Sequence, residues 1–210
     1  MTFAMNEVEA TAKRATRGAG YVWGLAEEAA KATRWLCVHG FDGASELAAT
    51  LNRGMAKTAA DHTPVDPMTD WQASDVLCPL TSGASLSDFA SRLKDAPLVL
   101  RNVASPAMLL PFAAMAARQL DGALTLKTDG FTATFDPQGF GCDGACPEVA
   151  SMVSIQTGGS VSQPTALLDR ASPSPAAWAT LNAYAHKTFA PATEESRRLG
   201  AGGAELTDND

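Results

Sequence analysis

An Asp-Gly pair, Asp129-Gly130, constrains the fold of this chain more than any other feature of its sequence. This pair favours a two-residue hairpin turn, and the residues on both sides of it alternate between apolar and polar. Pairing across the turn gathers the apolar side chains on one face and threonines and a lysine on the other. The predicted partners are Thr128 with Phe131, Leu126 with Ala133, and Leu124 with Phe135. Because the turn and the alternation independently select the same register, the sequence predicts a β-hairpin over residues 123–135.

Helical spacing of apolar residues dominates the N-terminal quarter of the chain. Small and apolar residues recur every three to four positions and predict helices over residues 5–17, 22–39 and 42–54. A glycine follows each segment, and glycine ends helices cheaply in the left-handed conformation. Asp42 is expected to cap the third helix with its carboxylate.

The middle of the chain is less regular. Residues 55–84 have several prolines and no clear period, so they are interpreted as a long loop with at most one short strand. Ser85 and Asp88 have the spacing of a capping box, so a helix is expected to begin at Ser85. Its expected buried residues are Leu86, Phe89 and Leu93.

Two Ser-Pro pairs predict helix starts further along the chain. Ser105-Pro106 combines an N-cap with proline at the first helical position. Pro111 should kink that helix unless the helix begins later. Ser174-Pro175 starts another helix in the same way. The expected buried stripe of this helix is Trp178, Leu181, Ala185 and Thr188.

The order of the elements predicts the fold class. Residues 98–103 and 148–157 have the composition of strands. N-terminal helices come first, then a mixed or antiparallel sheet that contains the hairpin at 123–135, with flanking helices. This order favours an α+β fold over an alternating parallel-sheet fold.

Length and charge limit the class of protein. A chain of 210 residues suits a single globular domain, placed at residues 1–203, with a last short helix capped by Thr193 and a flexible acidic tail at 204–210. The net charge of −7 argues against a nucleic-acid partner. No apolar run approaches a membrane span, and the first residues have no signal-peptide core. The chain is therefore expected to be soluble and cytoplasmic.

The most suggestive stretch for function is residues 17–28, where a glycine-rich turn leads into a helix start. Free backbone N–H groups and the helix dipole attract anions, and an arginine can bind a carboxylate or phosphate through two hydrogen bonds. The functional interpretation is an anion pocket with Tyr21 and Trp23 as walls and Glu27 as the nearest candidate acid or base. The structural alternative is a helix corner, with glycines for the turn and aromatics for packing. The predicted ligand-binding residues are Arg14, Arg17, Gly18, Gly20, Trp23, Ser196 and Arg197.

The last two of these residues belong to a second glycine cluster near the C-terminus. Arginines near the C-terminal end of a helix interact favourably with the helix dipole, and this is the structural explanation for Arg197 and Arg198. The functional hypothesis is that Ser196 and Arg197 reach the same pocket as Arg17. The sequence leaves open whether the segments 14–28 and 193–203 meet.

Several familiar sites are absent from the sequence. The glycine spacing fits neither a dinucleotide fingerprint nor a phosphate-binding loop of the Walker type, and no cofactor is identified. Cys142 and Cys146 have CxxxC spacing with no second close pair, so reduced thiols are favoured over a disulfide, and a disulfide over zinc. No metal site is predicted. His186 is expected to be solvated.

The segments 6–36 and 189–210 resemble the opening and the end of a family of bacterial proteins of unknown function. The quoted segments are NEVEATAKRATRGAGYVWGLAEEAAKATRWL and FAPATEESRRLGAGGAELTDND. The resemblance implies a stand-alone cytoplasmic bacterial protein. It brings no activity, cofactor or catalytic residue.

Two hypotheses for the function follow from the sequence. The first is a protein that binds a small acidic metabolite, with enzymatic activity left open, because a cationic helix start stands out in an acidic chain. The second is a non-catalytic interaction subunit, either a homodimer or a partner of a metabolic enzyme. Its basis is the absence of a catalytic constellation, together with the aromatic residues Trp23, Trp35 and Trp71, which are expected to be exposed.

Overall fold

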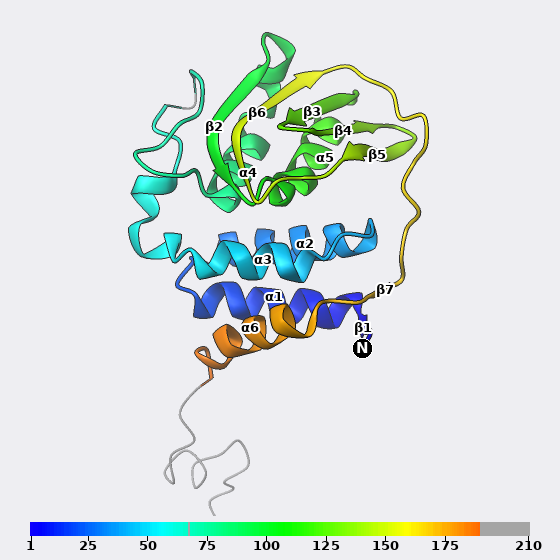
Figure 1. Ribbon diagram of the computed structural model, residues 1–210. Coiled ribbons are helices and arrows are strands. Elements are labelled where there is room, and N and C mark those ends of the chain that lie inside the picture. Colours follow the sequence, from blue (N-terminus) through cyan, green and yellow to red (C-terminus); the bar gives the residue numbers. More distant parts are fainter. Residues whose placement is uncertain (67, 190–210) are drawn as a thin grey trace, which may run out of the picture.

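The computed structural model describes residues 1–66 and 68–189, and it has helices packed in layers beneath one antiparallel sheet (Figure 1). The outermost helices are α1 and α6, the next layer is α2 and α3, and α4 and α5 lie between that layer and the sheet. The helices are α1 (Met5–Gly18), α2 (Trp23–Val38), α3 (Gly43–Asn52), α4 (Pro79–Asp88), α5 (Leu110–Gln119) and α6 (Pro175–His186). The arrangement is the predicted α+β fold.

The first three helices agree with the sequence expectation. In α1, Val8, Ala12 and Ala15 are fully buried, as their helical spacing predicts. The carboxylate of Asp42 accepts a hydrogen bond from the Ser45 backbone N–H at 3.0 Å, which confirms the predicted cap of α3.

The main sheet has five strands in the order β2-β6-β3-β4-β5, and every neighbouring pair is antiparallel. The predicted hairpin is present as β3 and β4, with Leu124 opposite Phe135 and Thr128 opposite Phe131. Its apolar face packs on α5, which explains why the register is strongly specified. The strands are β2 (Leu98–Ala104), β3 (Leu124–Thr128), β4 (Phe131–Asp136), β5 (Gly139–Gly144) and β6 (Val149–Thr157).

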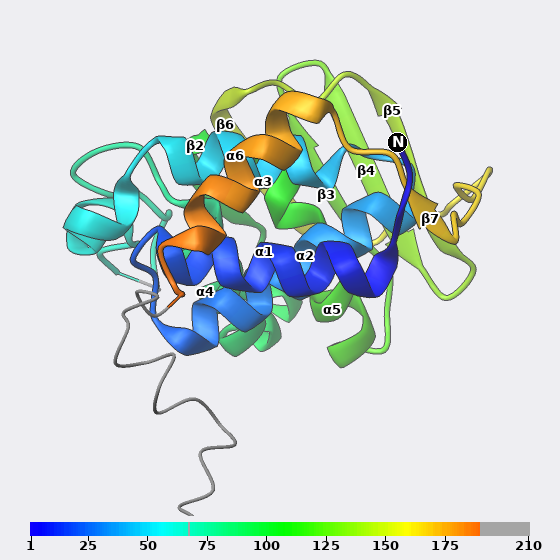
Figure 2. The same cartoon turned by 90° about the horizontal axis from the view of Figure 1, so that it is seen from below.

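A small second sheet ties the start of the chain to the segment before α6. It pairs β1 (Phe3–Ala4) with β7 (Arg170–Ala171) in antiparallel register. In Figure 2, α6 lies along α1. Helix α1 follows β1 and helix α6 follows β7, so both helices lead away from the small sheet. The last predicted helix, capped by Thr193, and the acidic tail lie outside the described residues.

The predicted capping box at Ser85 is wrong. Helix α4 begins at Pro79 and ends at Asp88, so Ser85 lies in its last turn. Proline at the first position sets the helix start without a side-chain cap. Leu86 and Leu93 are buried as expected, but Phe89 comes after the helix end and is 39% exposed.

The irregular segment before α4 has a structural purpose. It contains the 3-10 helix η1 (Met55–His62) and then runs along the free edge of β2. The backbone of Trp71 and Leu77 pairs with β2 in two isolated bridges, so this edge is covered. A loop that closes a sheet edge has no period of its own, which is why the sequence showed none.

Other boundaries differ from the sequence reading in detail. Strand β5 was not predicted, because glycine and aspartate dominate it. A 3-10 helix η3 (Pro106–Leu109) precedes α5, so Pro111 falls in the first turn of α5, where proline is tolerated. A further 3-10 helix, η2 (Ala90–Lys94), follows α4.

Helix α6 begins as predicted and ends early. The Ser174 hydroxyl accepts a hydrogen bond from the Ala177 N–H at 3.2 Å, which confirms the cap. The helix stops at His186, so Thr188 is exposed rather than part of the buried stripe. His186 is exposed, as expected.

Candidate functional site

A cavity of about 560 Å³ lies at the corner where α1 ends, α2 begins and α6 ends. Four residues of the predicted anion pocket contribute to it. We call it the corner cavity, and its lining is Lys13, Arg14, Arg17, Gly18, Trp23, Lys187 and Thr188. Two segments far apart in the sequence therefore meet at one cavity, although Ser196 and Arg197 lie outside the described residues.

The two glycines of the corner, Gly18 and Gly20, are needed for the path and packing of the backbone. A side chain at Gly18 would collide with the carbonyl group of Tyr184, so glycine here lets α6 cross α1 closely. Gly20 has φ +104 and makes the turn between the helices, but it does not line the cavity. The structural explanation given by the sequence therefore holds for both glycines.

The cations of the corner cavity are held in place by their neighbours. Arg17 Nη1 donates to the Tyr21 carbonyl at 2.6 Å, and Lys13 Nζ pairs with Glu27 Oε1 at 2.8 Å. Both cations lie over the Trp23 ring, with Lys13 Nζ at 4.5 Å and Arg17 Cζ at 5.8 Å from its centroid. Arg14 forms no ion pair with any residue that the structure describes.

Glu27 is poorly suited to be the acid of this site. The hydrogen bond from Lys13 lowers the pKa of the Glu27 carboxyl, and the Trp23 indole N–H, which donates at 3.1 Å, acts in the same direction. Glu27 is therefore ionised at neutral pH and accepts hydrogen bonds. It stands beside the cavity as the partner of Lys13 rather than in its lining.

Tyr21 is wrong as a wall of the predicted pocket, and three of the backbone N–H groups predicted to hold the anion are already used. Tyr21 is buried, and its hydroxyl lies 3.4 Å from Cys78 Sγ, so it packs in the core and forms no wall. The N–H groups of Ala19, Gly20 and Tyr21 donate to carbonyls of the last turn of α1. They close that helix and are not available to an anion, because each N–H group already has a backbone acceptor.

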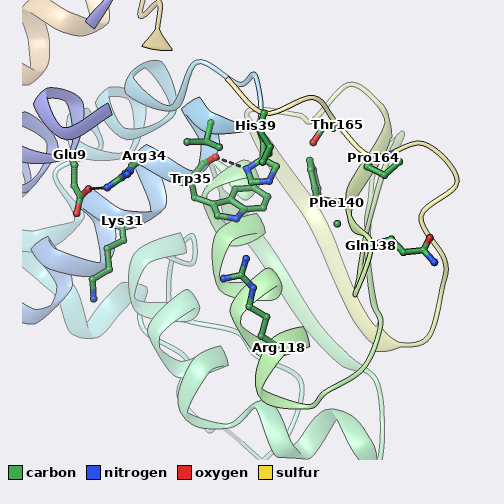
Figure 3. A pocket seen from close by; sticks show the side chains of 13 residues that line it. Glu9, Lys31, Arg34, Trp35, His39, Arg118, Gln138, Phe140, Pro164 and Thr165 are labelled. Carbon is green, nitrogen blue, oxygen red and sulfur yellow. Dashed lines mark hydrogen bonds and ion pairs between the residues drawn. The ribbon is translucent and has the colours of Figure 1, made fainter. Parts of the chain in front are cut away.

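A second and larger hollow lies along the second half of α2 (Figure 3), whereas the corner cavity lies at the start of this helix. It has one lobe of about 600 Å³ and an adjoining lobe of about 350 Å³, bounded by α2, α5 and the turn between β4 and β5. We call it the aromatic groove. The residues that line both lobes are Trp35, His39, Arg118, Gln138, Gly139 and Phe140.

Three rings form the floor of the aromatic groove. The imidazole of His39 stacks on the Trp35 indole with centroids 3.8 Å apart. The Phe140 ring meets both of them edge-on, at 5.0 Å from Trp35 and 5.4 Å from His39. Trp35 and His39 are four residues apart, so this spacing at the end of α2 was the only signal of the floor in the sequence.

The protonation state of His39 follows from its hydrogen bond. His39 Nδ1 lies 2.8 Å from the Trp35 carbonyl oxygen, and a carbonyl only accepts, so Nδ1 carries the proton. Burial lowers the pKa of His39, the hydrogen bond to Trp35 opposes this, and the charge of Arg118 lowers the pKa further. The imidazole is therefore neutral at pH 7, and its Nε2 is an acceptor.

The charges around the groove differ in their pairing. Arg34 pairs with Glu9, and Lys31 pairs with Glu28, each at 2.8 Å. Arg118 has no ion pair within the described part of the chain, and its side chain extends from α5 toward the Trp35 ring (Figure 3). The groove therefore has one unpaired permanent cation.

Nothing in the described residues indicates a metal site or a membrane span. Within residues 1–66 and 68–189, no three His, Cys, Asp or Glu side chains come together to hold a metal ion. The four cysteines are unbridged, and burial raises the pKa of Cys146 to about 12. No helix in the same residues is long and apolar enough to cross a membrane.

Comparison with known proteins identifies one segment of the chain. No curated protein and no solved structure matches the chain. The resemblance of residues 6–36 to a family of unknown function is confirmed, whereas residues 189–210 lie outside the matched range. Residues 3–97, which run from β1 through α4 to the start of β2, match the family described as "Protein of unknown function (DUF3726)".

Proposed function

We propose that the protein binds a small anionic metabolite in the corner cavity. One observation supports this most directly. Of the described residues that line the cavity, four are cations and none is an acid, in a chain whose net charge is −7. Glu27 beside the cavity offsets the charge of Lys13, which leaves Arg14, Arg17 and Lys187 without an ion pair among the described residues. Such a concentration of positive charge attracts an anion against the repulsion of the rest of the protein.

The side chains are also prepared to hold a ligand. The hydrogen bond to the Tyr21 carbonyl restrains the Arg17 guanidinium, so less conformational entropy is lost on binding. A guanidinium has five N–H donors, and the bond to Tyr21 uses one of them. Arg17 therefore retains donors for a carboxylate or phosphate, and Arg14 adds a second unpaired guanidinium at the same wall.

The cavity also has an apolar surface. Trp23 is 59% exposed, and its ring forms one wall beside the cations. An inorganic ion would leave this ring unused, whereas an organic anion would bury part of it. We therefore expect a phosphorylated or carboxylated metabolite rather than a free inorganic anion.

The test is a thermal-shift titration at low salt with inorganic phosphate, sugar phosphates and dicarboxylates. A ligand that binds only the folded state stabilises it by about 2.7 kcal/mol at a hundredfold excess over Kd. The response should disappear in Arg14→Ala/Arg17→Ala and persist in Arg53→Ala, a matched arginine that caps the C-terminus of α3 and lies outside both sites. An organic anion that stabilises all three proteins equally would contradict the proposal.

The alternative, an interaction subunit, has one feature in its favour. Trp23 and its neighbour Val22, which is 64% exposed, form an apolar surface beside the cations. Trp71 is fully buried and Trp35 is half-buried, so two of the aromatics expected on the surface are not there. Light scattering of the wild type and of Trp23→Ser separates the hypotheses, because a dimer built on this surface should dissociate in the variant.

A further inference from the structure

We propose that the aromatic groove is a second binding site, for a planar aromatic carboxylate that carries a ring hydroxyl. The proposal is independent of the corner cavity, because the two sites share no lining residue. Three parts of the groove select three parts of such a ligand.

The floor selects the ring. Trp35 and His39, both half-buried, present aromatic surface to a hollow of about 600 Å³, and Phe140, which is 3% exposed, packs edge-on against both of them. This volume is within the usual range of about 300–1,000 Å³ for small-molecule sites. Aromatic side chains prefer offset-stacked and edge-on partners, and both arrangements are already present among these three rings. A flat ligand ring would extend the same packing.

Arg118 selects the carboxylate. It lines both lobes and has no ion pair with any described residue, whereas Lys31 and Arg34 in the same wall are paired with glutamates. Arg118 is exposed, so its guanidinium is accessible to a ligand, and a guanidinium forms two parallel hydrogen bonds with a carboxylate. Asp121 and Asp136 line the same lobe, but neither forms an ion pair with Arg118 within the described residues. The Arg118 guanidinium is therefore the group at the α5 end that can pair with a ligand carboxylate.

His39 selects the hydroxyl. Its Nδ1–H is used by the Trp35 carbonyl, so the neutral ring offers Nε2 as an acceptor. No hydrogen bond to this nitrogen is present among the described residues. A ligand hydroxyl would supply the missing donor, and a ligand without it would leave Nε2 unsatisfied and shielded from water.

The segment after β6 contributes Pro164, Thr165 and Leu167 to the groove, and the one polar side chain among them has an unsatisfied hydroxyl within the described structure. Thr165 N donates to the Phe140 carbonyl at 2.8 Å, which holds the segment after β6 against β5. The Thr165 hydroxyl, drawn at the rim of the groove in Figure 3, is enclosed and has no hydrogen-bond partner in the described structure. A small shift of this segment around a ligand would give the hydroxyl a polar partner.

The experiment is isothermal titration with benzoate and the hydroxybenzoate isomers at pH 8. We expect at least one isomer to bind more tightly than benzoate. Arg118→Ala should weaken binding of both ligand types on the order of tenfold or more, because a charge-assisted pair is lost. His39→Phe keeps the stacked ring and should remove the preference for the hydroxylated ligand while benzoate binding is retained.

Two controls define the outcome. Arg53→Ala and Arg14→Ala/Arg17→Ala should bind the hydroxybenzoate like the wild type, and circular dichroism checks that each variant is folded. No binding of any isomer at millimolar concentration, or binding that is unchanged in Arg118→Ala, overturns the proposal. Neither result would affect the phosphate and dicarboxylate titrations that test the corner cavity.

Discussion

The corner cavity and the aromatic groove lie at opposite ends of α2 and are built in opposite ways. Most residues of the corner come from one short stretch, 13–23, and only Lys187 and Thr188 join from the end of the chain just after α6. The groove takes its residues from five stretches that are distant in the sequence, at Glu9, Trp35, Arg118, Phe140 and Thr165. Charges close together in a chain remain close in a helix, whereas an aromatic floor exists only after the layers have packed.

The two sites also differ in the force that would hold a ligand. The corner depends on exposed cations, whose attraction is screened over about 10 Å at 0.1 M salt. The groove depends on ring contacts and a single exposed guanidinium, so fewer charges are screened and salt should affect binding there less. Raising the salt concentration should therefore weaken binding at the corner more than in the groove.

The variant with the largest expected effect removes the floor of the groove. Phe140 is buried and contacts Trp35, His39, Phe41 and Phe135. Phe140→Ala should lower the free energy of unfolding by about 3–5 kcal/mol, because it leaves a cavity in the core. Urea denaturation measures this.

The matched control for that variant is Phe89→Ala, at a phenylalanine that is 39% exposed and outside both sites. Its cost should be clearly smaller. Below the unfolding temperature, Phe140→Ala should lose the benzoate response and keep the response of the corner to phosphorylated ligands. Loss of both responses would mean that the sites are coupled.

The second largest loss of stability is expected from Gly18→Ala, which disturbs the backbone packing at the corner cavity. The β-carbon of Gly18→Ala would collide with the Tyr184 carbonyl, so α6 must move away from α1. Overpacking of this kind costs about 1–3 kcal/mol, and the shift displaces Lys187 and Thr188 from the cavity. Thermal denaturation and the sugar-phosphate titration should both record the change.

Gly24→Ala is the control, because nothing lies within 4 Å of the added carbon. Alanine is the better helix former, so this variant should be neutral or more stable by up to about 1 kcal/mol. If Gly18→Ala were equally harmless, the close crossing of α1 and α6 would not be the reason for glycine at position 18.

The smallest effect is a pH dependence confined to the groove. Burial lowers the pKa of His39 below its ordinary value of 6.5, and Arg118 adds to this, while Asp121 and Asp136 line the adjoining lobe. The unfolded chain then binds a proton more readily than the folded one. The contribution of His39 to stability is complete above about pH 6.5 and is lost as the pH falls toward the lowered pKa.

His39→Phe should remove this part of the pH dependence. The measurement is the difference in unfolding free energy between wild type and variant from pH 8 to pH 5, which should change only in the acidic half of that range. A difference that stays constant with pH would mean that His39 titrates as it does in the unfolded chain.

Local signals in the sequence were sufficient for much of the fold. The Asp129-Gly130 turn and its flanking alternation gave the correct hairpin register, and the Asp42 and Ser174 caps gave two helix starts. These features depend on residues within a few positions of one another. The prediction of where α4 begins was wrong, because the helix begins at Pro79 and the apparent capping box at Ser85 caps no helix start.

The candidate sites divide in the same way. Arg14, Arg17, Gly18 and Trp23 could be selected from the sequence, because a cationic glycine-rich turn is a local pattern. The sequence could not show that Tyr21 turns inward to Cys78 or that the N–H groups of the turn close α1. Both depend on how α1 and α2 pack against the rest of the core.

The sequence by itself determined the α+β class, the hairpin, the N-terminal helices and the concentration of cations at the corner, because each follows from local propensity, periodicity or charge. Tertiary structure alone decided that α6 completes the corner cavity and that the segment at Trp71 covers the edge of β2. It also placed Arg118 beside the stacked pair of Trp35 and His39. The physical reason is that contacts between distant segments arise from burying apolar surface across layers, and no local pattern encodes which surfaces will meet.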